Sequence, residues 1–164
     1  LRNQGMRERY VYEIAGHNYR MTELQAAVGI PQMERIDEIN ATRRANAAKL
    51  SESLADAPGV TVPTVREGAT SVWHQYTIRV TAESAVDRDG MVAGLDEAGI
   101  GCGIYYPRTA YDYECYRSND AVIISDCPEA ELASAEVVSL PVHPYLTDAD
   151  IAEVGAAVVD LAQG

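Results

Sequence analysis

The sequence predicts an α/β fold in which a long N-terminal helix precedes a small three-stranded sheet with helices on one face. Three observations predict it. Apolar residues recur at helical spacing over 22–54, polarity alternates with a period of two over 72–80, and capped helical segments separate the later strands. Because strands alternate with helices, the connections cross over one face of the sheet, which we expect to be mostly antiparallel or mixed.

The long helix has a clear start and an interrupted middle. Thr22, followed three residues later by Gln25, fits a capping box. Pro31 disfavours helix at the preceding residue, so we expect a kink or two abutting helices there. The apolar positions at helical spacing are Leu24, Val28, Ile36, Ile39, Ala47, Leu50 and Leu54. Pro and Gly in "ADAPGV" end the helical region, which predicts a connecting segment over 1–58 and a small domain over 59–164.

The second part of the chain alternates between strands and helices. The alternation predicts a strand over 72–80 with His74, Tyr76, Ile78 and Val80 on one face, after a polar connection over 61–71. Asp87 caps a helix that runs to about residue 98 and stops at Gly99. The glycine-rich stretch 99–107 then becomes a short strand.

A tyrosine-rich irregular segment covers 108–127 and is typical of a functional or covering loop. A helix follows from residue 128 to about 137, and a short strand over 138–140. Thr147 caps a last helix whose apolar face carries Ile151, Val154, Val158 and Leu161.

Composition excludes several classes of protein. A net charge of −12, from 25 acidic and 13 basic residues, opposes binding to nucleic acid. No apolar run is long enough to span a membrane, and the first residues lack a signal-peptide core. The three cysteines are widely spaced, which favours reduced thiols and a cytoplasmic protein. The chain has twelve arginines and one lysine. Two explanations of this bias stay open: a salt-rich cytoplasm, or a genome that favours arginine codons.

Most candidate motifs for chemistry are absent. The "GIGCG" stretch leads into a strand, so it offers no helix N-terminus to a phosphate. The three histidines lack the spacing of a helical metal pair, so we expect no metal site. The dense polar constellation is Asn18, Tyr19 and Arg20, with Arg2 and Asn3 upstream. An amide and a guanidinium suit a phosphate. The alternative is a turn at Asn18 and an ion pair between Arg20 and Glu23.

Several stretches, taken in order, resemble one family. They are "LRNQG", "GHNYRMTELQAAVGIPQMERID", "RRANAAKL", "WHQYTIRV", "GIGCGIYYP" and "CPEAELASAEVVSLPVHPYLTDADI". Together they resemble the C-terminal part of the DegT/DnrJ/StrS-type aminotransferases over essentially the whole chain. These are pyridoxal 5'-phosphate (PLP)-dependent enzymes of fold-type I that aminate keto groups on nucleotide-linked sugars. The resemblance therefore implies the C-terminal small domain of such an enzyme, working as a homodimer with glutamate as the expected amino donor.

The resemblance also implies roles for individual residues. Asn18 would reach the cofactor phosphate of the other subunit, and Arg20 would support that phosphate or the diphosphate of the substrate. Arg2 and Asn3 match the family's R-N-x-G segment near the active site, and with Tyr19 they are expected to contact substrate. Tyr111 falls where the family commonly has a histidine, so a substrate contact there stays open.

The lysine that binds the cofactor precedes the R-N-x-G segment in the family, so we expect it upstream of Leu1. Lys49 lies in a helix far from that position and cannot replace it. We therefore assign no catalytic residue here, expect the chain to be inactive alone, and expect the apolar face of 22–54 to be poorly covered. Two alternatives remain: a sugar dehydratase of the same family, with histidine replacing the lysine, and a truncated, non-catalytic interaction or regulatory domain.

Overall fold

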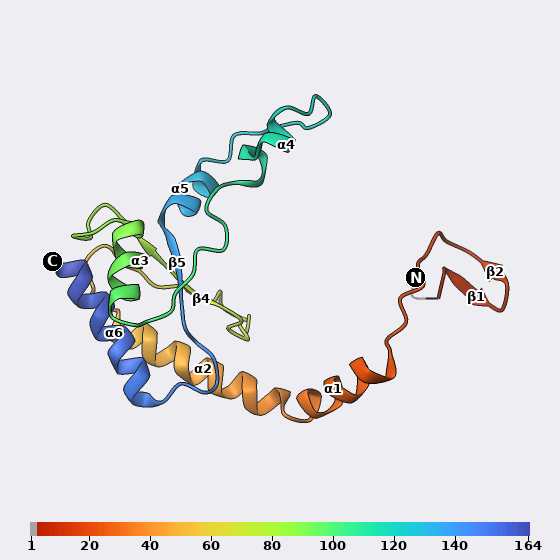
Figure 1. Ribbon diagram of the computed structural model, residues 1–164, viewed down its shortest axis with the longest axis horizontal. Coiled ribbons are helices and arrows are strands. Elements are labelled where there is room, and N and C mark those ends of the chain that lie inside the picture. The colour runs from red at the N-terminus through yellow and green to blue at the C-terminus, as the bar shows by residue number, and fades with distance from the viewer. Residues whose placement is uncertain (1–2) are drawn as a thin grey trace. The chain divides into compact units, whose positions relative to one another are not determined.

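A computed structural model describes residues 3–164, and the chain divides into two compact units (Figure 1). The N-terminal unit extends to Ile39, and the C-terminal unit runs from Asn40 to Gly164. The predicted boundary between 58 and 59 concerns the organisation of a longer protein and stays a prediction.

The N-terminal unit begins with a small hairpin that the sequence did not predict. Its antiparallel strands are β1 (Met6–Glu8) and β2 (Val11–Tyr12). Gly5 has φ +81°, and a Cβ atom there would lie 1.8 Å from the carbonyl oxygen of Ile14. Only glycine fits so close to the opposing backbone. Strands of three and two residues are too short to produce a polarity period, which is why the pattern was missed.

Helix α1 (Glu23–Glu34) starts as predicted. Gln25 N–H donates to Thr22 Oγ1 at 3.3 Å, and Thr22 N–H donates to Gln25 Oε1 at 2.8 Å, which completes the capping box. A second helix, α2 (Ile36–Ser53), follows at once. Two abutting helices are therefore confirmed, but the break falls at Arg35, and Pro31 lies inside α1.

The C-terminal unit is built on a three-stranded antiparallel sheet. Strand β4 (Tyr76–Val80) lies between β3 (Val60–Thr61) and β5 (Val137–Leu140). Tyr76 pairs with Leu140 and Ile78 pairs with Val138. The helices of this unit after α2 are α3 (Arg88–Glu97), η1 (Ala110–Asp112), α4 (Glu114–Arg117), α5 (Pro128–Glu136) and α6 (Asp148–Gln163).

The predicted fold class is confirmed, but one strand is not where it was expected. The stretch 99–107 contributes only a single bridge, between Gly103 and Ser139, and the third strand is β3. The central strand begins at Tyr76 instead of residue 72, because Trp73 has φ +48° and bends the chain before it. The loop 108–127 holds two short helices, η1 and α4.

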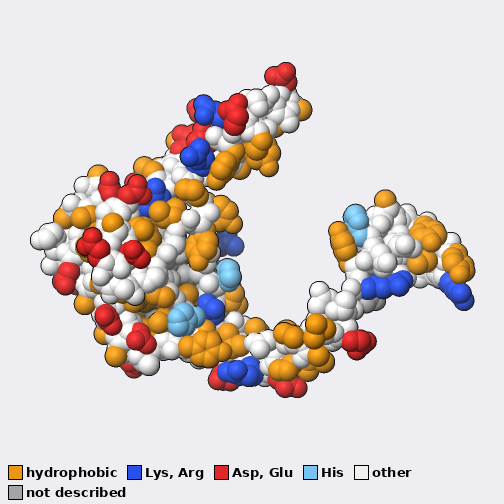
Figure 2. Space-filling view, in the orientation of Figure 1, with side chains coloured by type: hydrophobic (Ala, Val, Ile, Leu, Met, Phe, Trp, Pro, Cys, Tyr) orange, Lys and Arg blue, Asp and Glu red, His pale blue; other side chains and the backbone are white. Residues whose placement is uncertain are grey.

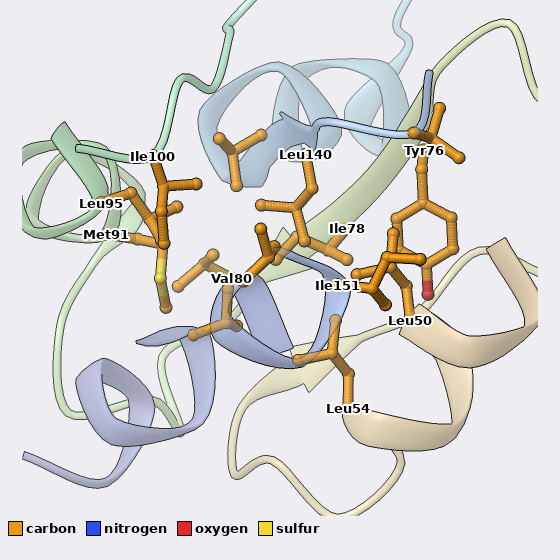
Figure 3. Close-up of a cluster of buried hydrophobic side chains, with 14 of the residues drawn as sticks. Leu50, Leu54, Tyr76, Ile78, Val80, Met91, Leu95, Ile100, Leu140 and Ile151 are labelled. Carbon is orange, nitrogen blue, oxygen red and sulfur yellow. The ribbon is translucent and has the colours of Figure 1, made fainter. Parts of the chain in front are cut away.

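The core of the C-terminal unit lies between one face of the sheet and the helices α2, α3 and α6. Figure 3 shows Tyr76, Ile78 and Val80 on β4 among side chains from those helices. The fully buried large side chains are Leu50, Leu54, Tyr76, Ile78, Met91, Leu95, Val138 and Val158. The predicted helix caps Asp87 and Thr147 both accept a backbone hydrogen bond, so α3 and α6 start where the sequence placed them.

Candidate functional site

The candidate site is at the base of the hairpin in the N-terminal unit. Asn3 and Asn18 form an antiparallel bridge through their backbones. Beside it, the N–H of Gln4 donates to the carbonyl oxygen of His17 at 2.7 Å. These bonds bring Asn3 and Gln4 against the Asn-Tyr-Arg segment, although the chain between them forms a hairpin. The two stretches that the sequence grouped are therefore neighbours.

The side chain of Arg20 is tied to the same place. Its Nη2 donates to Oδ1 of Asn3 at 3.1 Å. In the same segment, the rings of His17 and Tyr19 stack at 4.8 Å with an interplanar angle of 14°. Asn18 is joined to Asn3 through its backbone and Arg20 through its side chain, so an amide and a guanidinium lie next to the same residue.

The charge at this place suits an anion. Within residues 3–164, Arg20 bonds the neutral amide of Asn3 and does not pair with Glu23, so the surface ion-pair alternative is not found. A guanidinium has five N–H donors, and the contact with Asn3 occupies one of them. Arg20, Asn18 and Asn3 are all exposed. The group therefore offers positive charge and hydrogen-bond donors to a ligand from outside the unit, and it fits a phosphate.

The remaining predicted site residues have different surroundings. Arg2 lies outside the described residues. Tyr19 is 66% exposed and stacks on His17. Tyr111 belongs to the C-terminal unit, where its hydroxyl donates to Oε1 of Glu131 at 2.9 Å. Partial desolvation, and also the Glu131 carboxylate, raise the pKa of Tyr111, so its phenol is a hydrogen-bond donor and not a base near neutral pH.

Lys49 has the surroundings of a surface residue. Its ammonium pairs with the carboxylate of Asp148, and both side chains are largely exposed. Among residues 3–164 no group of three or more His, Cys, Asp or Glu side chains could hold a metal ion. None of the described helices is long and apolar enough to cross a bilayer.

One contact at the site was not predicted. The side chain of Asn3 holds Arg20, and its implied role as a substrate contact stays a prediction. No signal in the sequence links the two residues, because their contact depends on the hairpin closing. A second unpredicted contact lies in the C-terminal unit, where Arg43 Nη1 donates to the carbonyl oxygens of Trp73 and His74 at 3.0 and 3.3 Å. Arg43 thereby fixes the bend before β4.

Two curated proteins are each about one third identical to this chain over most of its length. The erythromycin biosynthesis sensory transduction protein EryC1 of Saccharopolyspora erythraea is 35% identical over 147 residues, 90% of this chain and 38% of that protein. A dTDP-3-amino-3,4,6-trideoxy-α-D-glucose transaminase of Streptomyces venezuelae is 34% identical over 146 residues, 89% of this chain and 37% of that protein. The chain thus spans about two fifths of the length of these curated relatives.

Solved structures also match nearly the whole of this chain. DesV of S. venezuelae superposes over 100% of this chain and 43% of its own, with a TM-score of 0.85 and 33% identity. A DegT DnrJ EryC1 StrS aminotransferase from Brucella abortus superposes over 99% of this chain and 41% of its own, with a TM-score of 0.82 and 28% identity. Residues 1–159 match the DegT/DnrJ/EryC1/StrS aminotransferase family, and the chain belongs to that family.

Proposed function

We propose that this chain is the C-terminal part of a PLP-dependent aminotransferase that transfers an amino group to a nucleotide-linked ketosugar. The relatives support it, since one of them is named as a transaminase of a dTDP-sugar. The observation in this chain that carries the proposal is the base of the hairpin, where Asn18 and Arg20 are held by Asn3. In this position an amide and a guanidinium can bind a phosphate.

Bound PLP supplies the electron sink that amino-group transfer requires. The residues of this chain would hold its phosphate. The Asn18 amide would donate one hydrogen bond, and the Arg20 guanidinium would donate through the N–H groups not used by Asn3. Arg2, Tyr19 and Tyr111 are proposed to contact the sugar nucleotide. Lys49 takes no part, and the lysine that binds the cofactor is expected upstream of Leu1.

We also propose that the whole protein is a cytoplasmic homodimer in which Asn18 and Arg20 serve the cofactor site of the other subunit. The exposed apolar residues of the N-terminal unit support an extensive interface with other parts of the protein. Leu24 is 76% exposed, Val28 63% and Met33 67%, and Figure 2 shows hydrophobic side chains lying open over α1 and the hairpin. Apolar patches of this kind are usually covered in the assembled protein. The three free cysteines fit a reducing compartment.

The test uses the whole polypeptide that contains this chain. With PLP it should develop a visible absorbance band, and with glutamate and a nucleotide-linked ketosugar it should release an amino sugar detectable by mass spectrometry. Arg20→Ala should raise the Kd for PLP about ten- to a hundredfold, because a hydrogen bond to a charged group is lost. Arg7→Ala is the matched control, since Arg7 pairs with Glu13 on the same hairpin.

Each outcome has a clear consequence. A colourless protein that forms no product contradicts the proposal and favours a non-catalytic domain. A protein that removes water from the sugar instead of aminating it favours the dehydratase, in which histidine replaces the lysine. Tyr111→Phe should raise KM for the sugar nucleotide more than it lowers kcat, and an unchanged KM would remove Tyr111 from the substrate contacts.

A further inference from the structure

We propose that Asn3 is a positioning residue, which fixes Arg20 for phosphate binding and does not itself contact the ligand. This inference rests on the proposed function and specifies how the same site is organised. It differs from the role expected from the sequence, in which Asn3 is a substrate contact.

Two separate bonds of Asn3 support this assignment. Its backbone pairs with the backbone of Asn18, so it sets the place of the amide. Its side-chain oxygen accepts a hydrogen bond from Arg20 Nη2 at 3.1 Å, so it sets the place of the guanidinium. Asn3 thus positions both groups, although the hairpin separates it from them in the sequence.

The chemistry of the acceptor matters as well. An arginine side chain has four rotatable bonds and loses about 2 kcal/mol of rotamer entropy when it is fixed. A contact that already restrains it in the free protein lowers that cost when the ligand binds. The amide oxygen of Asn3 is uncharged, so it restrains Arg20 without neutralising it. A carboxylate in the same place would compete with the phosphate for the guanidinium.

The backbone around Asn3 keeps this residue in place without its side chain. The N–H of Met6 donates to the carbonyl oxygen of Asn3 at 3.0 Å, and the Gln4 N–H bonds the carbonyl oxygen of His17 at 2.7 Å. Asn3 is also exposed. Asn3→Ala should therefore leave the hairpin folded and remove only the restraint on Arg20.

The experiment measures the Kd of the whole polypeptide, freed of cofactor, for PLP and for pyridoxal, which lacks the phosphate. Asn3→Ala should weaken binding of PLP about tenfold, the loss expected for one hydrogen bond to a charged group, and leave pyridoxal unchanged. Asn3→Leu, which keeps the branched shape of the side chain but has no acceptor, should do the same. Adding Asn3→Ala to Arg20→Ala should cause no further loss, because the role of Asn3 passes through Arg20.

The two proposals fail in different ways. If Arg20→Ala leaves the Kd for PLP unchanged, the assignment of the phosphate site is wrong, and the role of Asn3 falls with it. If Arg20→Ala weakens binding but Asn3→Ala and Asn3→Leu do not, only the positioning role is overturned. A loss that is additive in the double variant, equal for pyridoxal, or reproduced by Arg7→Ala would also overturn it, since each points to contact or folding in place of positioning.

Discussion

Both units of this chain contain apolar residues at helical spacing, but these residues are buried in the C-terminal unit and exposed in the N-terminal unit. The apolar positions of the C-terminal unit are covered by its own sheet and helices, and Leu50, Ile78 and Val158 are fully buried. In the N-terminal unit α1 has no buried residue, and among residues 3–39 only Gly5 is buried. The comparison teaches that apolar spacing alone does not decide burial, since the second unit covers its apolar side chains and the first leaves those of α1 exposed.

The largest expected effect comes from comparing one leucine in each unit. Leu50→Ala removes a fully buried side chain and should lower the free energy of unfolding of the chain by about 2–5 kcal/mol. Leu24→Ala, at a side chain 76% exposed, should change it by no more than about 0.5 kcal/mol. Urea unfolding followed by circular dichroism measures both. Equal losses would mean that α1 has a covered apolar face after all.

The next effect concerns association. We expect the isolated chain to self-associate through the apolar residues of the N-terminal unit, and Leu24→Glu with Met33→Glu should reduce this in sedimentation velocity. The matched control is Ile123→Glu, because Ile123 is 93% exposed but belongs to the C-terminal unit. A compact monomer at all concentrations would contradict the expectation, as would an equal effect of the control.

The two capping boxes give a smaller and cleaner comparison. Thr147→Ala should cost about 1 kcal/mol of stability, because α6 packs into the core and Thr147 Oγ1 accepts from Asp150 N–H. Thr22→Ala removes the same bond from α1 and should fray that helix without moving the urea midpoint of the C-terminal unit. Amide exchange by NMR separates the two. A shift in midpoint for Thr22→Ala would show that the units unfold together.

The smallest effect is a dependence on pH. Hydrogen bonds from the Thr147 N–H and hydroxyl, and more weakly the charge of His143, lower the pKa of Asp150 below its usual range. A depressed carboxyl pKa stabilises the fold above the unfolded value, near 3.9, and this contribution is lost as the pH falls through the folded pKa. Asp150→Asn should therefore weaken the acid-side fall in stability. Identical unfolding profiles below pH 4 would show that Asp150 contributes nothing there.

Much of the C-terminal unit could be predicted because its signals are local. The helix caps act within a few residues, as at Asp87 and Thr147, and so does the alternation at Tyr76, Ile78 and Val80. Strand β3 was missed because two residues carry no period. The stretch 99–107 was wrongly predicted as a strand, since pairing there reduces to Gly103 with Ser139. Whether a strand forms depends on the neighbour across the sheet, which a local pattern does not contain.

By itself, the sequence determined the order of the longer helices, the fold class and the residue types that suit an anion at Asn18 and Arg20. The tertiary structure alone decided that Asn3 lies against both, and that the face of 22–54 expected to be poorly covered is exposed in α1, while α2 contributes to a core. The physical reason is the distance over which each cause acts. Caps and periodicity are short-range properties of the chain, whereas hydrogen bonds across a closed hairpin and burial against a sheet exist only after distant segments have come together.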